Sequence, residues 1–307
     1  MKILLVILTT VIGLSAISEI GLRLTKGFGN PPLYIADDEI GYLLAPNQKL
    51  RRSGNLIATN QYSMRHSEIT SAKERDSKRI FLLGDSVVNG SWWSDQGNIL
   101  SALLGKKLET KSDRSVEVFN ASTNSWGPRN ELAYLKRYGL FDADTLILVI
   151  NTDDLFATKP TSLVVGTPSY PNQAPTLALI ELYQFYFATP QLIPELEKLR
   201  SARGENLEAN LAAIKEIKAI AIESNAKFIL ALTPLLKEFK EGSTKEEAKA
   251  RKSLQDLVAK ENINYLDFWQ IWSDFPQPEF LYRDRIHPSP QGNNKIIEQL
   301  TSVISNY

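Results

Sequence analysis

From residue 79 onward, short apolar runs alternate along the chain with stretches of helical periodicity. The runs lack the strict alternation of polar and apolar residues that marks a strand with one wet face, and they are typical of strands covered on both faces. They are 80-IFLLG-84, 116-VEVFNA-121, 145-TLILVIN-151, 227-KFILALTP-234 and 263-INYLDFW-269. We therefore expect each run to be a buried strand of one parallel sheet.

The stretches between the runs carry helix signals. Pro128 suits the first turn of a helix that we expect to continue to Tyr138, and Thr244 with Glu247 has capping-box spacing. Pro290 can open a last helix. Apolar residues recur at helical spacing at Leu207, Leu211, Ile214, Ile217 and Ala221, and again at Ile296, Leu300, Val303 and Ile304. This alternation predicts a three-layer α/β/α sandwich with its site at the carboxyl ends of the strands.

The N-terminus has the pattern of an export or anchoring segment. A charge-free run, 3-ILLVILTTVIGLSAIS-18, follows Lys2, and apolar residues continue beyond it to Leu24. Small residues before Glu19 fit a cleavage site, whereas Arg23 fits a position among lipid headgroups. We expect residues 1–24 to be a signal-anchor or a signal peptide, with the anchor favoured. The rest of the chain is then membrane-anchored outside the cytoplasm, or secreted if the segment is cleaved.

Two further segments interrupt the regular pattern. Residues 25–78 are rich in Gly, Pro, Asn and charge, and we expect a membrane-proximal segment that packs loosely on the main domain, 79–307. Residues 155–205 separate the third strand from the next clear helix and include the aromatic cluster 183-YQFYF-187. This insertion leaves the carboxyl end of a strand, so it is either a lid over the site or a packing elaboration.

Composition excludes several classes of function. Lys plus Arg (35) equals Asp plus Glu (35), so the chain lacks the basic surface that nucleic-acid binding needs. There is no Cys, and His66 and His287 are the only histidines. Thiol catalysis, disulfides and most zinc sites are therefore excluded, and we expect no metal or other cofactor.

Ser86 is the first candidate for chemistry. It follows Gly84 and Asp85 at the end of the first strand, just before a predicted helix. There its side chain can either cap the helix or attack a carbonyl group while its N–H helps to bind the oxyanion. Val88 occupies the last position of the G-x-S-x-G pattern, so that motif is not met.

The second candidate lies in 282-YRDRIHPSPQG-292. Asp284 and His287 are three residues apart just before the last predicted helix, and a nucleophilic serine needs such a base with an acceptor that fixes its tautomer. The pair can also be a structural hydrogen bond, and Asp267 is a competing acid that can instead cap the turn after its strand. His66 lies in a polar run. The predicted topology brings the segments of Ser86 and His287 to the same edge of the sheet.

These motifs resemble the blocks of the SGNH (GDSL) hydrolase family over about residues 79–300. The first block is 84-GDS-86 and the last, D-x-x-H-P, is 284-DRIHP-288, while 118-VFNASTNSWG-127 and 145-TLILVINTDDL-155 resemble the two middle blocks. The resemblance implies a triad of Ser86, His287 and Asp284. It also implies a flavodoxin-like sandwich of about five strands, and ester hydrolysis or acyl transfer without a metal.

Two positions depart from the family pattern at the predicted oxyanion site. Ser125 replaces the usual Gly of the second block, and Asp153 replaces the usual Asn of the third. An ionised carboxylate repels a developing negative charge, so Asp153 cannot act as that Asn does. Three alternatives remain open: Asp153 is protonated near Asp154, the donor is Asn151 or Asn124, or the enzyme is slow or inactive.

Two functions follow from these residues. The first is a serine-dependent ester hydrolase or O-acyltransferase that acts on an acylated small molecule, carbohydrate or envelope polymer, with the aromatics Trp92, Trp93 and Trp126 either stacking on substrate or packing. The alternative is a weak or inactive protein of this fold that binds a glycan or an envelope partner. Retention of all three triad positions favours catalysis, and Asp153 with Ser125 favours the alternative.

Overall fold

The five apolar runs form a parallel sheet. The computed structural model describes residues 1–69, 73, 76–111, 114–189 and 192–305. The strands are β5 (Lys78–Gly84), β6 (Val116–Ser122), β7 (Thr145–Asn151), β8 (Lys227–Thr233) and β9 (Asn264–Asp267). They lie in the order β6-β5-β7-β8-β9, and each neighbouring pair is parallel. This order is that of flavodoxin-like folds, so the predicted fold class is confirmed.

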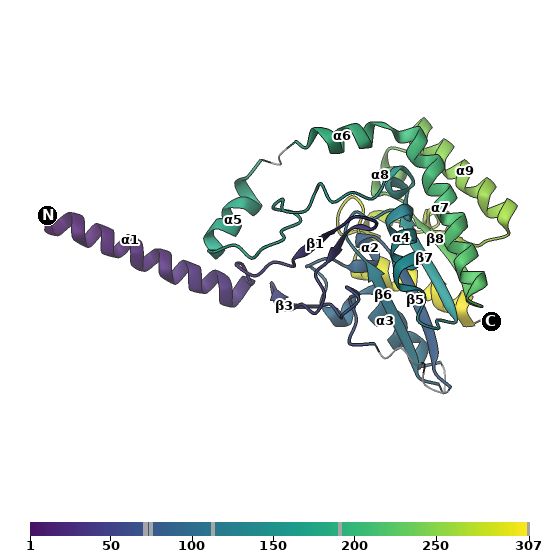
Figure 1. The fold of residues 1–307 in the computed structure, drawn as a ribbon, viewed down its shortest axis with the longest axis horizontal. Coiled ribbons are helices and arrows are strands. Elements are labelled where there is room, and N and C mark those ends of the chain that lie inside the picture. The colour runs from purple at the N-terminus through teal and green to yellow at the C-terminus, as the bar shows by residue number, and fades with distance from the viewer. Residues whose placement is uncertain (70–72, 74–75, 112–113, 190–191, 306–307) are drawn as a thin grey trace.

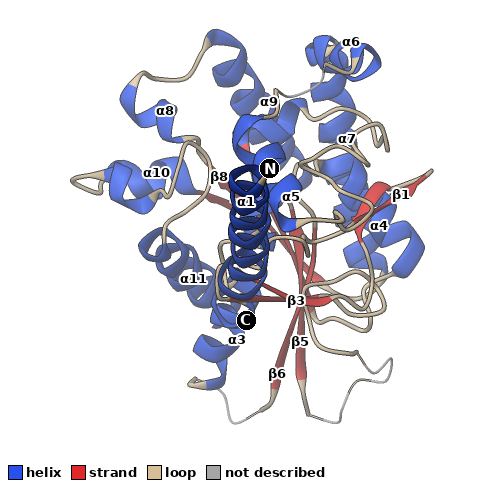
Figure 2. Cartoon of the chain, turned by 90° about the vertical axis from the view of Figure 1, so that its left-hand side faces the viewer, coloured by secondary structure: helices blue, strands red, loops and turns tan. Residues whose placement is uncertain are grey.

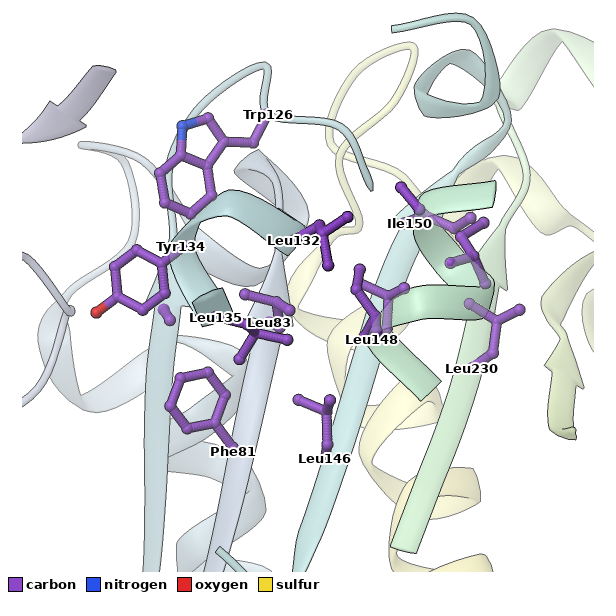
Figure 3. Packing of buried hydrophobic residues seen from close by; sticks show 14 of the residues in the cluster. Phe81, Leu83, Trp126, Leu132, Tyr134, Leu135, Leu146, Leu148, Ile150 and Leu230 are labelled. Carbon is purple, nitrogen blue, oxygen red and sulfur yellow. The ribbon is translucent and has the colours of Figure 1, made fainter. Parts of the chain in front are cut away.

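Helices cover both faces of the sheet. One face packs against α4 (Pro128–Tyr138), α7 (Arg203–Glu223) and α9 (Lys245–Glu261), and the other against α3 (Leu100–Glu109), α10 (Phe268–Ser273) and α11 (Pro290–Ser305). Phe81 and Leu83 of β5 point into the first layer, whereas Ile80 and Leu82 point into the second. Figure 3 shows the first layer, with Leu135 of α4 among these strand side chains. Because both layers are apolar, the strands show no polar alternation.

Local signals placed several element boundaries. Helix α4 and strand β7 have the predicted bounds, and Thr244 caps α9 by accepting the N–H of Glu247 at 3.2 Å. The fifth run is shorter than predicted. Its strand ends at Asp267, whose carboxylate accepts the N–H of Trp269 at 3.0 Å and so starts α10. The shorter elements are α2 (Ser86–Asn89), η2 (Gln96–Asn98), η3 (Thr152–Phe156), α8 (Leu236–Lys240) and η4 (Pro278–Leu281).

The N-terminal segment is a long helix that projects away from the sheet domain (Figure 1). Helix α1 (Lys2–Gly21) continues into η1 (Leu22–Lys26), and neither contains a buried residue. Within the 25 residues from Lys2 to Lys26, the most apolar stretch of 18 residues has a mean hydropathy of 2.3. The segment is therefore compatible with a signal anchor or a membrane span.

The segment between this helix and the sheet domain packs more tightly than predicted. It forms two antiparallel hairpins, β1 (Tyr34–Asp37) with β2 (Gly41–Leu44) and β3 (Lys49–Arg52) with β4 (Asn55–Ala58). Ile40, Leu43 and Met64 are buried in the same cluster as Phe81. The buried guanidinium of Arg65 donates to the carbonyls of Asn89 and Ser91, both at 2.7 Å. The expectation of loose packing is wrong, because this segment completes one layer of the core.

The insertion after β7 contains α5 (Ala178–Phe187) and α6 (Pro194–Ser201). Residues 190–191 of the predicted insertion, like 70–72 and 74–75 of the membrane-proximal segment, lie outside the described residues. Figure 2, viewed from the N-terminal side, shows α5 beside α1. The insertion therefore extends from the carboxyl end of the sheet to the base of the N-terminal helix.

Candidate active site

The sequence Gly-Asp-Ser forms a tight turn from β5 into α2. A Cβ on Gly84 would lie only 2.5 Å from the carbonyl oxygen of Val149, so no larger residue fits without a shift of the backbone. Asp85 caps α2, because its Oδ1 accepts the N–H of Val87 at 2.8 Å. Ser86 is thus the first helical residue, and an N–H at this position has no partner within the helix.

His287 lies between Asp284 and Ser86. Its Nδ1 is 2.8 Å from Oδ2 of Asp284, and its Nε2 is 2.8 Å from Oγ of Ser86. A carboxylate can only accept, so Nδ1 carries the proton and Nε2 is left to accept the serine hydroxyl proton. The structure therefore brings the three predicted triad residues into one hydrogen-bonded chain with the geometry of a nucleophile and its base.

Asp284 is held in its ionised form. Burial alone raises the pKa of its carboxyl, but hydrogen bonds from the backbone N–H groups of His287 and Ile286, each 2.9 Å long, and from the His287 ring outweigh that effect. The pKa of Asp284 therefore lies below its usual value. A carboxylate that stays charged can fix the imidazole tautomer and stabilise an imidazolium.

Asp85 and Asn151 form a buried polar pair behind the serine. The Asn151 amide donates to Oδ2 of Asp85 at 2.9 Å, and its carbonyl oxygen accepts the N–H of Asp153 at 2.7 Å. Burial raises the pKa of Asp85, although the hydrogen bonds from the Val87 N–H and the Asn151 amide oppose it. From the sequence alone, Asp85 is assigned no role beyond its place in the motif. The feature that could have identified it is a carboxylate that directly follows a buried strand.

The side chain of Asn124, the other proposed donor, also makes hydrogen bonds within the protein. Its amide donates to the hydroxyl of Tyr34 at 3.2 Å, and its carbonyl oxygen accepts from Ser91 at 2.7 Å. Each of the two Asn side chains has one further amide N–H. That Asn124 or Asn151 donates to an oxyanion stays a prediction.

Ser125 occupies a position that suits glycine. Its φ is +59°, in the left-handed region that a residue without Cβ adopts freely. Its hydroxyl accepts a hydrogen bond from Tyr170 at 2.8 Å. Tyr170 belongs to the insertion and packs edge-on against Tyr34 and Tyr42, with ring centroids 5.0 and 5.2 Å apart. Nothing in the sequence around Tyr170 pointed to this contact.

Asp153 lies at the site, as its alignment with the family motif implies. It lines a cavity of about 360 Å³ together with Ser86 and Ser125, and its side chain is exposed. The walls of the cavity still shield its carboxyl from part of the solvent, and this loss of hydration raises the pKa of Asp153; Lys237 opposes this and Glu247 adds to it. Asp153 therefore takes up a proton more readily than an ordinary aspartate.

A larger cavity of about 750 Å³ also reaches the serine. Ser86 and His287 line it together with the aromatic side chains of Trp92, Trp93 and Phe185. The ring of Trp93 stands edge-on to that of His287 with centroids 4.7 Å apart. The insertion forms one wall of both cavities, which favours the lid interpretation over a packing elaboration.

Three other candidates lie elsewhere. Trp126 is buried in the core and donates to the carbonyl of Tyr42 at 2.9 Å, so its predicted alternative role in stacking on substrate is wrong. His66 packs against Phe119 with centroids 5.1 Å apart. Asp267 pairs with Arg251 at 2.6 Å and caps α10. Among the described residues, no group of three His, Cys, Asp or Glu side chains could hold a metal ion.

Comparison with known proteins decides the family. The sequence model of the GDSL-like Lipase/Acylhydrolase family matches residues 82–295, about two thirds of the chain and all of the motifs described above. The chain belongs to this family. Membership in the GDSL-like family supports esterase activity of the hydrolase class. No curated protein matches the sequence.

The solved structures that match the chain include proteins described as GDSL-like. A lipase/acylhydrolase from Enterococcus faecalis is 16% identical, with 75% of this chain and 96% of that chain covered at a TM-score of 0.48. A GDSL-like lipase from Bacteroides thetaiotaomicron is 10% identical, with 78% and 92% covered at 0.48. The acetylxylan esterase Axe2 from Geobacillus stearothermophilus is 14% identical, with 72% and 91% covered at 0.47.

Proposed function

We propose that the chain is a serine-dependent carboxylic ester hydrolase or O-acyltransferase in which Ser86, His287 and Asp284 form the catalytic triad. The observation that carries this proposal is the hydrogen-bonded chain from Asp284 through His287 to Ser86, with both links 2.8 Å long. Serine, base and orienting acid are the groups that nucleophilic acyl transfer needs.

The reaction proceeds in two halves. Ser86 Oγ attacks the ester carbonyl while its proton passes to Nε2 of His287, and the C–O bond to the alcohol breaks as His287 returns that proton to the leaving oxygen. Water or a sugar hydroxyl then gives its proton to Nε2 of His287 and attacks the acyl-serine carbonyl. The bond from the acyl carbon to Ser86 Oγ breaks as His287 passes this proton to Oγ, which releases the acid or a new ester and restores Ser86. Hydrolysis and transfer differ only in this acceptor.

The developing oxyanion needs hydrogen-bond donors. The backbone N–H groups of Ser86 and Ser125 are the proposed donors, since Ser86 opens a helix and Ser125 lines the same cavity. A protonated Asp153 can supply a third donor, and the raised pKa of its carboxyl supports that role. An ionised Asp153 in the same place lowers the rate.

The proposed substrate is an ester-bearing small molecule, acylated carbohydrate or envelope polymer. The support is the open cavity of about 750 Å³ beside Ser86, with Trp92 and Trp93 in its walls, because indole rings offer flat apolar faces for stacking. We further propose that α1 anchors the protein in a membrane with the catalytic domain outside the cytoplasm. The exposed apolar surface of α1 supports the anchor.

A fluorophosphonate probe tests the triad. We expect the full chain to be labelled between pH 5 and 9 and labelling to vanish in Ser86→Ala. Ser224→Ala, an exposed serine at the end of α7 that lines neither cavity, is the matched control that keeps the labelling. Absence of labelling at every pH would leave the second candidate, a glycan- or partner-binding protein of this fold, which the exposed carboxylate of Asp153 at the oxyanion site favours.

A further inference from the structure

Helix α5 buries its charged residue and exposes most of its large apolar ones. The carboxylate of Glu181 is buried, where it pairs with Arg52 at 2.5 Å and accepts the N–H of Gly29 at 2.5 Å. Ile180, Tyr183 and Phe187 recur at positions i, i+3 and i+7, and the side chains of Tyr183 and Phe187 are 63% and 71% exposed. A helix on the surface of a soluble domain has the opposite arrangement. The outer face of α5 is therefore suited to an apolar environment.

The exposed apolar surface extends beyond one face of the helix. Glu181 is the only charged residue from 160 to 194. An uncharged surface rich in Tyr and Phe is typical of elements that lie at the boundary between a bilayer and water. The large exposed apolar residues here are Leu177, Ile180, Tyr183, Phe185, Tyr186, Phe187 and Leu192.

The start of helix α5 is attached to the carboxyl-terminal end of α1 and to η1. The carboxylate of Glu19 accepts the N–H groups of Ala178 and Leu179 at 2.8 and 3.0 Å, and Arg23 donates to the carbonyl of Thr176 at 3.0 Å. The charge-free run 3–18 rises about 24 Å as a helix, close to the roughly 30 Å of a hydrocarbon core. The first charged residues after that run are thus the ones that hold α5. Figure 1 shows α5 running across the end of α1 rather than along it.

The inner side of α5 faces the site. Gln184 and Phe185 line the same cavity of about 750 Å³ as Ser86 and His287. The ring of Phe185 also packs against that of Trp92, with centroids 6.0 Å apart. The helix thus separates the cavity that reaches the nucleophile from the surroundings of its own apolar outer face.

We propose that α5 lies in the interfacial layer of the bilayer that α1 enters, and that the cavity beside it receives an amphiphilic ester from the membrane surface. This inference rests on the proposed anchor and on Ser86 as the proposed nucleophile. We assign the bilayer as the partner that covers the outer face of α5, because this face begins where the exposed apolar surface of α1 ends. The polar part of the amphiphile enters the cavity, and the ester reacts as described above.

Nitroxide labels at single cysteines test the position of α5 without any use of activity. The chain has no native Cys, so Tyr183→Cys and Phe187→Cys in the full chain in phosphatidylcholine vesicles each carry one label. Ile222→Cys on α7 is the control, since Ile222 is an exposed apolar residue of a helix that packs on the sheet. Oxygen concentrates in the bilayer, whereas a water-soluble nickel chelate stays in water. We therefore expect oxygen to speed the spin relaxation of the labels at 183 and 187 more than the chelate does, and the chelate to have the larger effect at 222. The proposal is overturned if the labels at 183 and 187 are relaxed more by the nickel chelate than by oxygen, as at 222. It is also overturned if their spectra show dipolar broadening, because that would place a second copy of the chain against α5.

Ester hydrolysis tests the delivery of substrate. The double variant Tyr183→Asp/Phe187→Asp leaves the cavity lining unchanged, because neither side chain lines it. We expect at least a tenfold loss with p-nitrophenyl palmitate in the same vesicles and no loss with soluble p-nitrophenyl acetate, whereas Ile222→Asp changes neither rate. Equal loss on both esters, or none, refutes membrane delivery. If the wild-type chain hydrolyses neither ester, the proposed hydrolase activity and its proposed substrate are contradicted. The nitroxide labels still decide, independently, where α5 lies.

Discussion

The Nε2 atom of His287 lies 2.8 Å from Oγ of Ser86, although 201 residues separate them in the chain. The loop that carries His287 closes on itself, since Arg283 N–H donates to the His287 carbonyl and Ser289 N–H to the Leu281 carbonyl, both at 2.8 Å. The loop thus fixes the imidazole opposite the end of β5 before substrate binds.

Asp284→Asn should lower kcat for p-nitrophenyl acetate by roughly 10²- to 10⁴-fold, because an amide can hold the wrong imidazole tautomer. Steady-state kinetics and a melting curve check the effect on rate and fold. Asp267→Asn is the contrasting variant: it loses the Arg251 pair, so Tm should fall while kcat of the folded protein is kept. A larger loss of kcat in Asp267→Asn would transfer the role of triad acid to that residue.

Asp153→Asn should raise the rate most at alkaline pH. If protonated Asp153 donates to the oxyanion, wild-type activity falls as pH rises through the raised pKa of this carboxyl, and an amide donates at every pH. We expect a gain of about 10²-fold at pH 8 and a much smaller one at pH 5, read from kcat/KM profiles. Identical profiles for the two proteins would show that this side chain never meets the oxyanion.

Trp93→Ala should lower kcat by roughly 2- to 10-fold, since the edge-on contact of this ring with His287 helps to orient the imidazole. Trp93→Phe keeps an aromatic ring at this position and should restore most of the loss. A rise in KM with unchanged kcat would instead assign Trp93 to substrate binding.

Glu131→Gln should stabilise the protein at alkaline pH. Glu131 is fully buried on α4, and neither carboxyl oxygen has a hydrogen-bond partner among the described residues. Burial raises the pKa of Glu131 well above its usual value, so the native state binds a proton that the unfolded chain releases above about pH 4.3. Stability from this group is therefore complete below that pH and is lost as pH rises toward the native pKa.

Melting curves check this sign. We expect Tm of Glu131→Gln to exceed that of the wild type by at least about 2–4 °C at pH 8, the shift for roughly 1 kcal/mol, and by less at pH 5. Glu208→Gln on α7 removes an equal charge from an exposed site and should change Tm little at either pH. A uniform shift of Glu131→Gln at both pH values would contradict a buried, titrating carboxyl.

Local patterns in the sequence are sufficient to predict the strands of the sheet, several of its helices and the motifs. Runs such as 145–151 identified the strands, and residues such as Pro128 and Thr244 placed helix starts, because periodicity and capping depend on neighbours within a few positions. The predicted end of the fifth strand was wrong, because Asp267 caps the next helix and ends the strand although the apolar run continues. Family motifs then indicated Ser86 and His287 as partners.

The directions in which side chains point depend on the tertiary fold. Trp93 and Trp126 each follow a family block, yet one lines the cavity at His287 and the other is buried in the core. Glu181 turns inward because Arg52, far away in the sequence, lies beneath it, and the apolar face of α5 turns outward as a result. The environment of these side chains is set by contacts between distant segments, which no local pattern in the sequence records.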